Sequence, residues 1–261
     1  MKTKMLLTVL GVAGYLTALS FVAQAEDVLK VGMDPMYEPF SYQTPDGKMT
    51  GFDYEISEAL CEAIKVKCDI RAIPYDGSIS ALQSGEIDSL INTYNMTKER
   101  LERFTMVGPY IKPTWRFLVD GHSPINGSLD SLKGKTIGIE KGSVALVAYA
   151  NEKFAPSMKI ELYDQITDAV LDLNAGRVDA VFGDQNQLFY SYVKKQPDSY
   201  KMVGETVTTA QMSVQGQGFM LRKDDGKWPP RLKTALDTIL QNGKYDQISK
   251  KYFARNIFTE Q

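Results

Sequence analysis

The chain has 261 residues, of which 43% are hydrophobic and 24% charged, a composition typical of a soluble globular protein with one or two domains. The net charge of −2 provides no basic surface for nucleic acid, so we do not expect that partner. His122 is the only histidine, which excludes a site with two imidazoles and argues against a Ser/His/Asp triad. Two cysteines cannot form a four-thiolate metal site. We expect no metal, no cofactor and no catalytic residue.

Residues 1–25 have the pattern of a secretory signal peptide. Lys2 and Lys4 form a positive start, an apolar segment follows, and Ala23-Gln24-Ala25 is a cleavage site of the A-x-A type. We expect cleavage after Ala25 and a periplasmic mature protein. An uncleaved membrane anchor is the alternative. Cleavage removes two lysines and no acid, so the net charge changes from −2 to −4.

The two cysteines, Cys61 and Cys68, both belong to the mature chain. An even number of cysteines in an oxidising compartment indicates a disulfide bond. Two buried free thiols are the alternative.

Strands alternate with helices after residue 26. Residues 28–32 form an apolar strand, and Asp53 opens a helix with apolar residues three or four positions apart: Ile56, Ala59, Leu60, Ala63 and Ile64. We expect a strand at 70–73, a short helix at 78–83 that Gly85 ends, and a strand at 87–91. This alternation predicts parallel α/β units.

A ten-residue pattern occurs twice, as L-Q-S-G-E-I-D-S-L-I at 82–91 and L-N-A-G-R-V-D-A-V-F at 173–182. Each copy predicts a helix end, a glycine cap, and a strand with Asp at its second position. Residues 136–139 similarly resemble the strand that starts at Val28. We interpret the pattern as two similar lobes in which Asp88 and Asp179 have structural roles. Chance similarity is the alternative.

Two facing α/β lobes place a ligand site beyond the carboxyl ends of their strands. The candidate segments follow the predicted strands, at 34–37, 92–95, 141–143 and 183–184.

Arg100 is the candidate ligand for an anion. It lies three residues after Thr97, a residue type favoured at helix N-caps, and a guanidinium binds carboxylate bidentately. The segment 141–143 opens a later helix, whose N–H groups could bind the same anion. The alternative places Arg100 on the surface, within the charged run at 98–103.

Asp184 ends a strand and could hold an ammonium group, or it could cap a helix at 185–194. Asp34 offers a second acid, or it could cap the turn that follows it. Tyr37 offers an aromatic wall, and Tyr75 and Trp115 are further aromatic candidates. One Arg, two carboxylates and aromatic walls suit a zwitterion with a long, cationic side chain.

Several motifs together resemble the family 3 periplasmic solute-binding proteins, and within them the lysine/arginine/ornithine-, histidine- and octopine-binding branch. They are the leader, G-M-D-P-M-Y-E-P-F at 32–40, G-F-D-Y-E-I at 51–56, the cysteine pair, T-K-E-R at 97–100, L-K-G-K-T-I-G-I at 132–139 and K-Y-D-Q-I-S-K-K-Y-F at 244–253. The resemblance covers nearly the whole mature chain. The branch also carries a disulfide at this cysteine spacing.

The resemblance implies an α/β, two-lobe type II periplasmic binding protein fold with two crossover strands and a ligand cleft that closes about a hinge. Lobe one would comprise residues 26–111 plus 217–261, and lobe two residues 112–216.

The resemblance also implies a role for each candidate. Arg100 matches the Arg that binds the α-carboxylate, and Asn95 a position whose backbone N–H helps it. Asp184 matches the acid that binds the α-ammonium, together with a hydroxyl at Thr93. Three positions match residues of the side-chain pocket. Tyr37 matches a stacked aromatic residue, Asp34 an acid that binds a basic side chain, and Tyr75 an apolar wall residue.

The chain departs from the family pattern at two places. The family usually has Ser or Gly at Asn92 and Thr93, and Ser at Asn95. Val144 replaces a Thr of the second lobe; its backbone N–H remains, and Ser143 could supply part of the lost hydroxyl. These departures affect the choice of side chain and favour an amino acid or a derivative such as an opine.

We expect a monomeric periplasmic protein that is not an enzyme and that delivers an amino acid to an inner-membrane ABC permease. One alternative is an enzyme on the same fold, resembling the exported cyclohexadienyl dehydratases. Another is the ligand-sensing part of a receptor.

Overall fold

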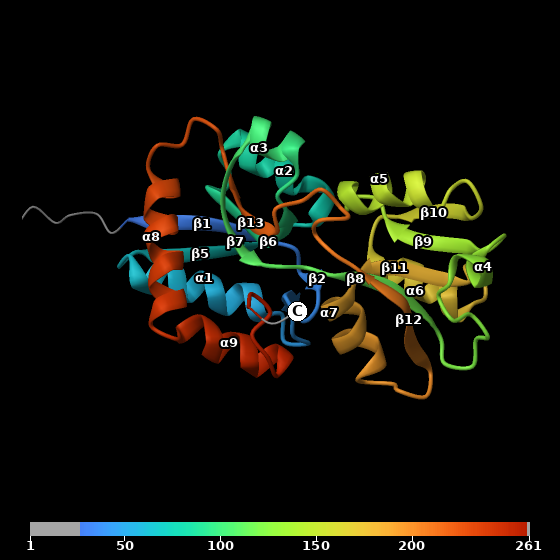
Figure 1. Ribbon diagram of the computed structural model, residues 1–261. Helices are drawn as coiled ribbons and strands as arrows, with labels where there is room; N and C mark the ends of the chain where they lie inside the picture. Colours follow the sequence, from blue (N-terminus) through green and yellow to red (C-terminus); the bar gives the residue numbers. More distant parts are fainter. Residues whose placement is uncertain (1–26, 260–261) are drawn as a thin grey trace, which may run out of the picture.

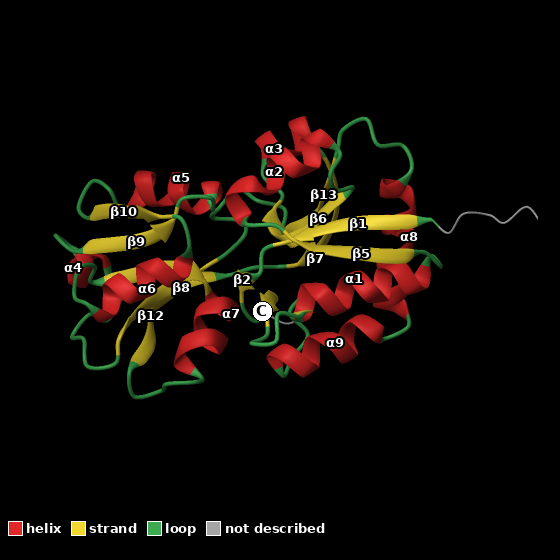
Figure 2. Ribbon diagram, turned by 180° about the vertical axis from the view of Figure 1, so that it is seen from behind, coloured by secondary structure: helices red, strands yellow, loops and turns green. Residues whose placement is uncertain are grey.

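The computed structural model describes residues 27–259, so the expected leader at 1–25 lies outside the described residues. The described chain folds into two lobes, each built on a five-stranded sheet with helices on both faces (Figure 1, Figure 2). This confirms the predicted α/β class. Between residues 27 and 259, no helix has both the length and the apolar character that a membrane span requires.

The first sheet has the order β5-β1-β6-β13-β7. Strand β1 lies parallel to β5 and β6, whereas β13 runs antiparallel to both β6 and β7. The strands span β1 (Val28–Met33), β5 (Lys67–Ala72), β6 (Ser89–Asn95), β7 (Thr105–Ile111) and β13 (Gln217–Leu221).

The second sheet repeats this topology in the order β10-β9-β11-β8-β12. Its strands span β8 (Trp115–Asp120), β9 (Thr136–Glu140), β10 (Lys159–Tyr163), β11 (Ala180–Asp184) and β12 (Tyr200–Val207). The chain crosses between the sheets at 112–114 and returns at 208–216. Each sheet therefore receives its inserted antiparallel strand, β8 or β13, directly after a crossing. The lobe boundaries given above stay a prediction.

The helices cover both faces of each sheet. In the first lobe α2 and α3 lie on one side, and α1 and α9 on the other (Figure 1). The bounds in this lobe are α1 (Phe52–Ala63), α2 (Tyr75–Ser84), α3 (Lys98–Arg103), α8 (Trp228–Gln241) and α9 (Lys244–Phe253). A small sheet joins β2 (Met36–Tyr37), β3 (Ser41–Gln43) and β4 (Met49–Thr50).

In the second lobe α5 and α6 pack on opposite faces of the sheet. Side chains of β8 alternate between these faces, with Phe117 and Val119 in the cluster under α5 and Leu118 in the cluster under α6. The bounds are α4 (Leu129–Leu132), α5 (Val144–Lys153), α6 (Ile166–Asn174) and α7 (Gln185–Leu188), which continues into a π-helix (Phe189–Val193).

The predicted repeat is a real structural repeat. Asp88 accepts a hydrogen bond from the backbone N–H of Lys30 at 3.0 Å, and Asp179 accepts one from Thr136 at 2.9 Å. In return, the N–H of each Asp donates to the carbonyl of the same partner residue, at 2.8 Å in both lobes. Each Asp stands just before its strand rather than at its second position, where it fastens the start of the neighbouring parallel strand.

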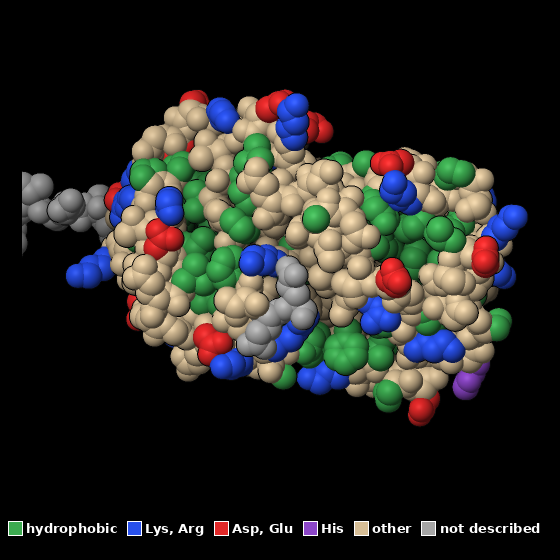
Figure 3. Space-filling model, in the orientation of Figure 1, with side chains coloured by type: hydrophobic (Ala, Val, Ile, Leu, Met, Phe, Trp, Pro, Cys, Tyr) green, Lys and Arg blue, Asp and Glu red, His purple; other side chains and the backbone are tan. Residues whose placement is uncertain are grey.

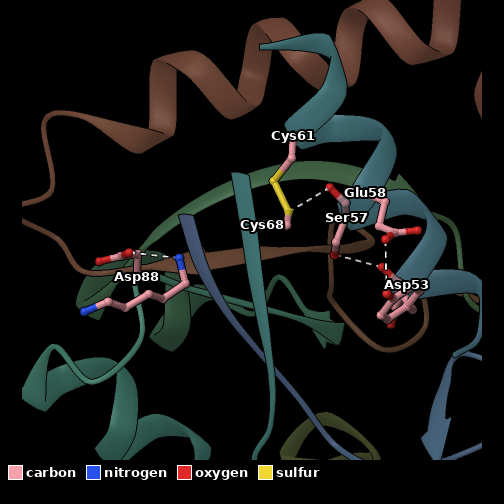
Figure 4. The surroundings of a disulfide bond; sticks show 8 residues. Asp53, Ser57, Glu58, Cys61, Cys68 and Asp88 are labelled. Carbon is pink, nitrogen blue, oxygen red and sulfur yellow. Dashed lines mark hydrogen bonds between the residues drawn. A yellow bond between two sulfur atoms is a disulfide. The ribbon is translucent and has the colours of Figure 1, made fainter. Parts of the chain in front are cut away.

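Cys61 and Cys68 form the predicted disulfide, which joins α1 to the edge strand β5 (Figure 4). Their Cα atoms are 5.9 Å apart, within the usual range for a disulfide. The Cys68 sulfur lies 3.3 Å from the carbonyl oxygen of Ser57, which stands one helical turn before Cys61 in α1. The bond therefore lies at the outer edge of the first lobe.

Several predicted element bounds were wrong. Strand β6 starts at Ser89 and continues to Asn95, whereas we expected it to end at residue 91. The segment Asn92-Thr93-Tyr94-Asn95 is polar, yet it is fully buried within the sheet. The expected strand at 70–73 begins earlier, as β5, and the expected helix at 78–83 is longer at its start, as α2.

Candidate functional site

A cavity between the two lobes brings together most of the predicted site residues. The lining comes from both lobes: Tyr37, Tyr75, Asn92, Thr93, Asn95, Arg100, Trp115, Glu140, Ser143, Leu146, Ile166, Phe182, Gly183, Asp184, Gln187 and Gln217. Four lining residues carry a buried side-chain oxygen without a hydrogen-bond partner, namely Asn95, Glu140, Asp184 and Gln217. Such groups are costly to bury unless something binds them, so this cavity is the candidate ligand site.

A second hollow lies between α8 and the edge strand β7, where hydrophobic side chains reach the surface (Figure 3). Its walls are mainly apolar, and its cation Lys233 is already paired with Asp237 at 3.1 Å. Within residues 27–259, no wall residue has a buried, unpartnered side-chain oxygen or nitrogen. This hollow lacks the polar groups that orient a small polar ligand.

Arg100 is buried and pointed into the interlobe cavity by its neighbours. Thr97 caps α3 as predicted, since its side chain accepts a hydrogen bond from the N–H of Arg100. The guanidinium donates to the carbonyl of Asn95 at 3.3 Å and to the hydroxyl of Tyr75 at 3.2 Å, and it stacks over the ring of Tyr94. Within the described part of the chain, Arg100 makes no salt bridge with a carboxylate. A buried guanidinium without a counter-ion suits an anionic ligand group.

Tyr75 connects the two lobes at the edge of the cavity. Its hydroxyl donates to the carbonyl oxygen of Gly142 at 3.0 Å, and its ring stacks on Tyr94. A Cβ atom on residue 142 would lie 2.1 Å from the Tyr75 ring. Only glycine at this position therefore lets the lobes approach as closely as they do.

Thr93 is held in an unusual backbone conformation. Its φ of 49° is rare for a β-branched residue, and such strain is found at binding sites that the surrounding structure supports. The Thr93 N–H donates to the Tyr110 hydroxyl at 3.1 Å, which donates to the Asp53 carboxylate at 2.8 Å. Burial raises the pKa of Asp53 to about 7. These two buried side chains form a support under the floor of the cavity.

Asp184 lies at the end of β11 and caps α7. One carboxylate oxygen accepts hydrogen bonds from the N–H groups of Asn186 and Gln187, at 2.8 and 3.0 Å. The other oxygen is buried, unpartnered and part of the cavity lining. Burial raises the Asp184 pKa to about 6. The capping role and a binding role, first considered as alternatives, are thus compatible: each uses a different oxygen.

Glu140 is a cavity carboxylate that the sequence analysis missed. It is the last residue of β9, 5% exposed, and one of its oxygens accepts a hydrogen bond from Ser143 at 3.0 Å. Burial and the nearby charge of Asp34 raise its pKa to about 7. The candidate segment after this strand began at residue 141, one residue beyond Glu140, and an acid that closes an otherwise apolar strand was the available signal.

The structure does not bring Asp34 and Val144 into the cavity lining. Asp34 is buried and accepts a hydrogen bond from the N–H of Met36 at 2.9 Å, the turn-capping role considered above. Its second oxygen is buried without a partner, and burial raises its pKa. Val144 is 43% exposed, and its N–H already donates to the carbonyl of Gly142. Asn92 lines the cavity, but its side-chain oxygen accepts from Ser41.

A cavity enclosed by two lobes, in which four residues carry a buried side-chain oxygen without a hydrogen-bond partner, defines a protein that binds a small solute. The described residues contain no group of three or more metal-ligating side chains. The chain belongs to family 3 of the bacterial extracellular solute-binding proteins, whose family model matches residues 29–255.

Known relatives agree with this assignment. The chain is 34% identical to the L-arginine-binding protein of Pseudomonas aeruginosa, over 90% of this chain and 91% of the relative. It is 31% identical to the lysine/arginine/ornithine-binding periplasmic protein of Escherichia coli, over 98% of both chains. A solved ancestral arginine-binding protein bound to arginine is 31% identical with a TM-score of 0.77, covering 87% of this chain and 98% of the other. These likenesses confirm the predicted family, the type II fold and the prediction of a binding protein rather than an enzyme.

Proposed function

We propose that the protein captures an L-α-amino acid with a cationic side chain in the periplasm and delivers it to an inner-membrane ABC permease. The observation that carries this proposal is the buried Arg100, which has no carboxylate partner within residues 27–259, in the same cavity as the unpartnered oxygen of Asp184.

Two charged residues of the cavity lining suit the α-amino acid group. Arg100 offers a bidentate fork for the α-carboxylate. Asp184 offers its free oxygen to the α-ammonium, with the hydroxyl of Thr93 in the same lining. A ligand that carries both groups satisfies charges from opposite lobes at once. It therefore binds best when the cleft is closed.

The remaining lining suits a cationic side chain. Tyr37 is buried next to both Asp184 and Glu140. Burial is the main cause of its raised pKa, and the charges of these two carboxylates add to it. An aromatic face next to carboxylates attracts a cation. The relatives named as binding arginine, or lysine, arginine and ornithine, support this choice.

Transport and localisation follow from the family. The relatives include periplasmic binding proteins, and the sequence of residues 1–25 supports export. An ABC permease is the expected partner of such a carrier, and we propose that the protein acts as a monomer.

The test is to identify the ligand directly. Protein purified without added amino acids is denatured, and the released ligand is identified by mass spectrometry. Calorimetry on refolded protein then compares arginine, lysine, ornithine, histidine, glutamine and octopine. We expect a basic amino acid, or a derivative of one, to bind with micromolar affinity or better. Absence of binding for all six at millimolar concentration would rule out the proposal.

A further inference from the structure

Glu140 lacks a cationic partner in a place where a carboxylate needs one. It is 5% exposed, and its oxygen Oε1 has no hydrogen-bond partner. The neighbouring Lys141 turns away from it and pairs instead with Asp76 and Asp164. Within the described residues, no lysine or arginine forms a salt bridge with Glu140. A buried carboxylate in this state is stabilised by a bound cation.

A second buried acid, Asp34 of the first lobe, lies outside the cavity lining. Asp34 directly follows β1 in the first lobe. Burial is the main cause of the raised pKa of Glu140, and the charge of Asp34 adds to it. Asp34 is 2% exposed, and its oxygen Oδ2 also has no hydrogen-bond partner. Glu140 is therefore the one of these two acids that a ligand in the cavity can contact directly.

Resting on the proposed function, we propose that Glu140 contacts the cationic end of the ligand side chain and selects a guanidinium over an ammonium group. The subsite is complete only when the lobes are closed, because Glu140 comes from the second lobe and Tyr37 and Tyr75 come from the first.

The preference for guanidinium follows from donor geometry. A guanidinium presents five N–H donors in a rigid plane and can bind one carboxylate through two parallel hydrogen bonds. An ammonium group presents three donors around one point and is more strongly hydrated, so it loses more on entering a closed cavity. Tyr37 and Tyr75 line the same cavity, and a planar cation stacks on such rings.

The experiment compares Glu140→Gln with the wild type by calorimetry against arginine, lysine and citrulline. Citrulline has the shape of arginine with an uncharged end. In the wild type we expect arginine to bind more tightly than lysine, and lysine more tightly than citrulline. In Glu140→Gln we expect arginine to lose about tenfold to a hundredfold in affinity, lysine to lose less, and citrulline to change by less than about threefold.

Glu161→Gln is the matched control, because it makes the same change at a partly exposed position on the adjacent strand β10. It should leave all three affinities unchanged. Equal losses for arginine and citrulline in Glu140→Gln would mean that Glu140 only positions Ser143, and would overturn the inference. Unchanged arginine affinity, or a wild type that prefers lysine, would also overturn it while leaving the proposed function intact. Failure of the wild type to bind any amino acid would instead remove the proposed function.

Discussion

Arg100 is oriented before any ligand arrives. The carbonyl of Asn95 and the hydroxyl of Tyr75 each accept one of its N–H groups, and the ring of Tyr94 supports its plane. The entropy of ordering this long side chain is therefore lost during folding rather than during binding. A preorganised guanidinium of this kind should contribute much of the affinity for the ligand.

We expect Arg100→Ala to weaken amino-acid binding by about 3–5 kcal/mol, because it removes a bidentate charged pair and leaves the ligand carboxylate buried alone. Arg100→Lys should restore only part of this loss, since a point charge cannot reproduce the planar fork. Calorimetry on both variants is the measurement. Arg103→Ala, at an exposed position of the same helix that pairs with Glu99, is the control. Unchanged affinity in Arg100→Ala would contradict the assigned role.

The support beneath Thr93 gives a second prediction at this scale. Tyr110→Phe removes the acceptor of the Thr93 N–H and the donor to Asp53, all within a buried region. We expect it to lower stability by about 1–3 kcal/mol and to weaken ligand binding as well. Thermal unfolding and calorimetry measure the two effects. Tyr54→Phe, which loses only an exposed hydrogen bond to Glu58, should change neither. A Tyr110→Phe protein with wild-type affinity would show that Thr93 needs no such support.

Strand ends show how far the sequence could predict the site. Arg100, Asp184 and Tyr37 were identified because strand ends and a helix cap can be read from local patterns. The course of β6 could not be read in this way, because Asn92 and Asn95 have the residue types of a loop. Their burial depends on long-range pairing with β13, which follows more than 100 residues later in the chain. Local patterns do not contain that information.

The fold, like the site, could be predicted from the sequence only in part. The repeated segment indicated two lobes because both copies use Asp to fasten a neighbouring strand, and this local arrangement recurs in each lobe. The two crossover strands came from the family resemblance, and the antiparallel insertion of β8 and β13 was not predicted, since periodicity does not reveal strand order. Glu140 was missed for a local reason, because only residues after the strand were considered and Glu140 is the last residue of β9.

The disulfide is a stabilising feature of one element pair, α1 and β5. We expect the double variant Cys61→Ser with Cys68→Ser to lose about 2–3 kcal/mol of stability, because a short loop is no longer closed in the unfolded chain. Ligand affinity should not change, since the bond lies away from the cavity lining. Thermal unfolding and thiol labelling of the unreduced, denatured wild type are the tests. Two reactive thiols per wild-type chain would contradict the bond.

The buried acids give the whole molecule a defined response to pH. Burial raises the pKa of Asp184 to about 6, and burial with the charge of Asp34 raises that of Glu140 to about 7. In the ligand-free protein these groups hold protons that the unfolded chain has already released. Stability should therefore fall as pH rises from about 4 to 7, by up to about 1.4 kcal/mol per pH unit for each proton. Thermal unfolding across this range measures it.

Ligand binding should show the opposite trend. A cationic ligand favours the ionised carboxylates, so binding releases protons and affinity rises between about pH 5 and 8. Calorimetry in two buffers with different ionisation enthalpies measures the released protons. Glu140→Gln should release fewer protons than the wild type. Proton uptake on binding would contradict this account.

Several contacts join the two lobes without touching the cavity lining. The hydroxyl of Ser191 donates to the carbonyl of Glu38 at 2.7 Å, Lys195 pairs with the Glu38 carboxylate at 2.6 Å, and Arg255 donates to Asn186 at 3.0 Å. We expect Lys195→Ala to weaken arginine and lysine binding by the same factor, less than about fivefold, because the lost pair is partly exposed. Calorimetry with both ligands measures it, and a change in their ratio would contradict it.

These outer contacts imply that the strength of binding and the choice of ligand are separate properties of the molecule. The apparent dissociation constant is the intrinsic constant divided by the population of the binding-competent state. Contacts such as Ser191 with Glu38 favour that state equally for every ligand, whereas Arg100, Asp184 and Glu140 distinguish one ligand from another. Substitutions on the outer surface can thus adjust the protein to scarce or abundant solute, while the set of molecules that it accepts stays the same.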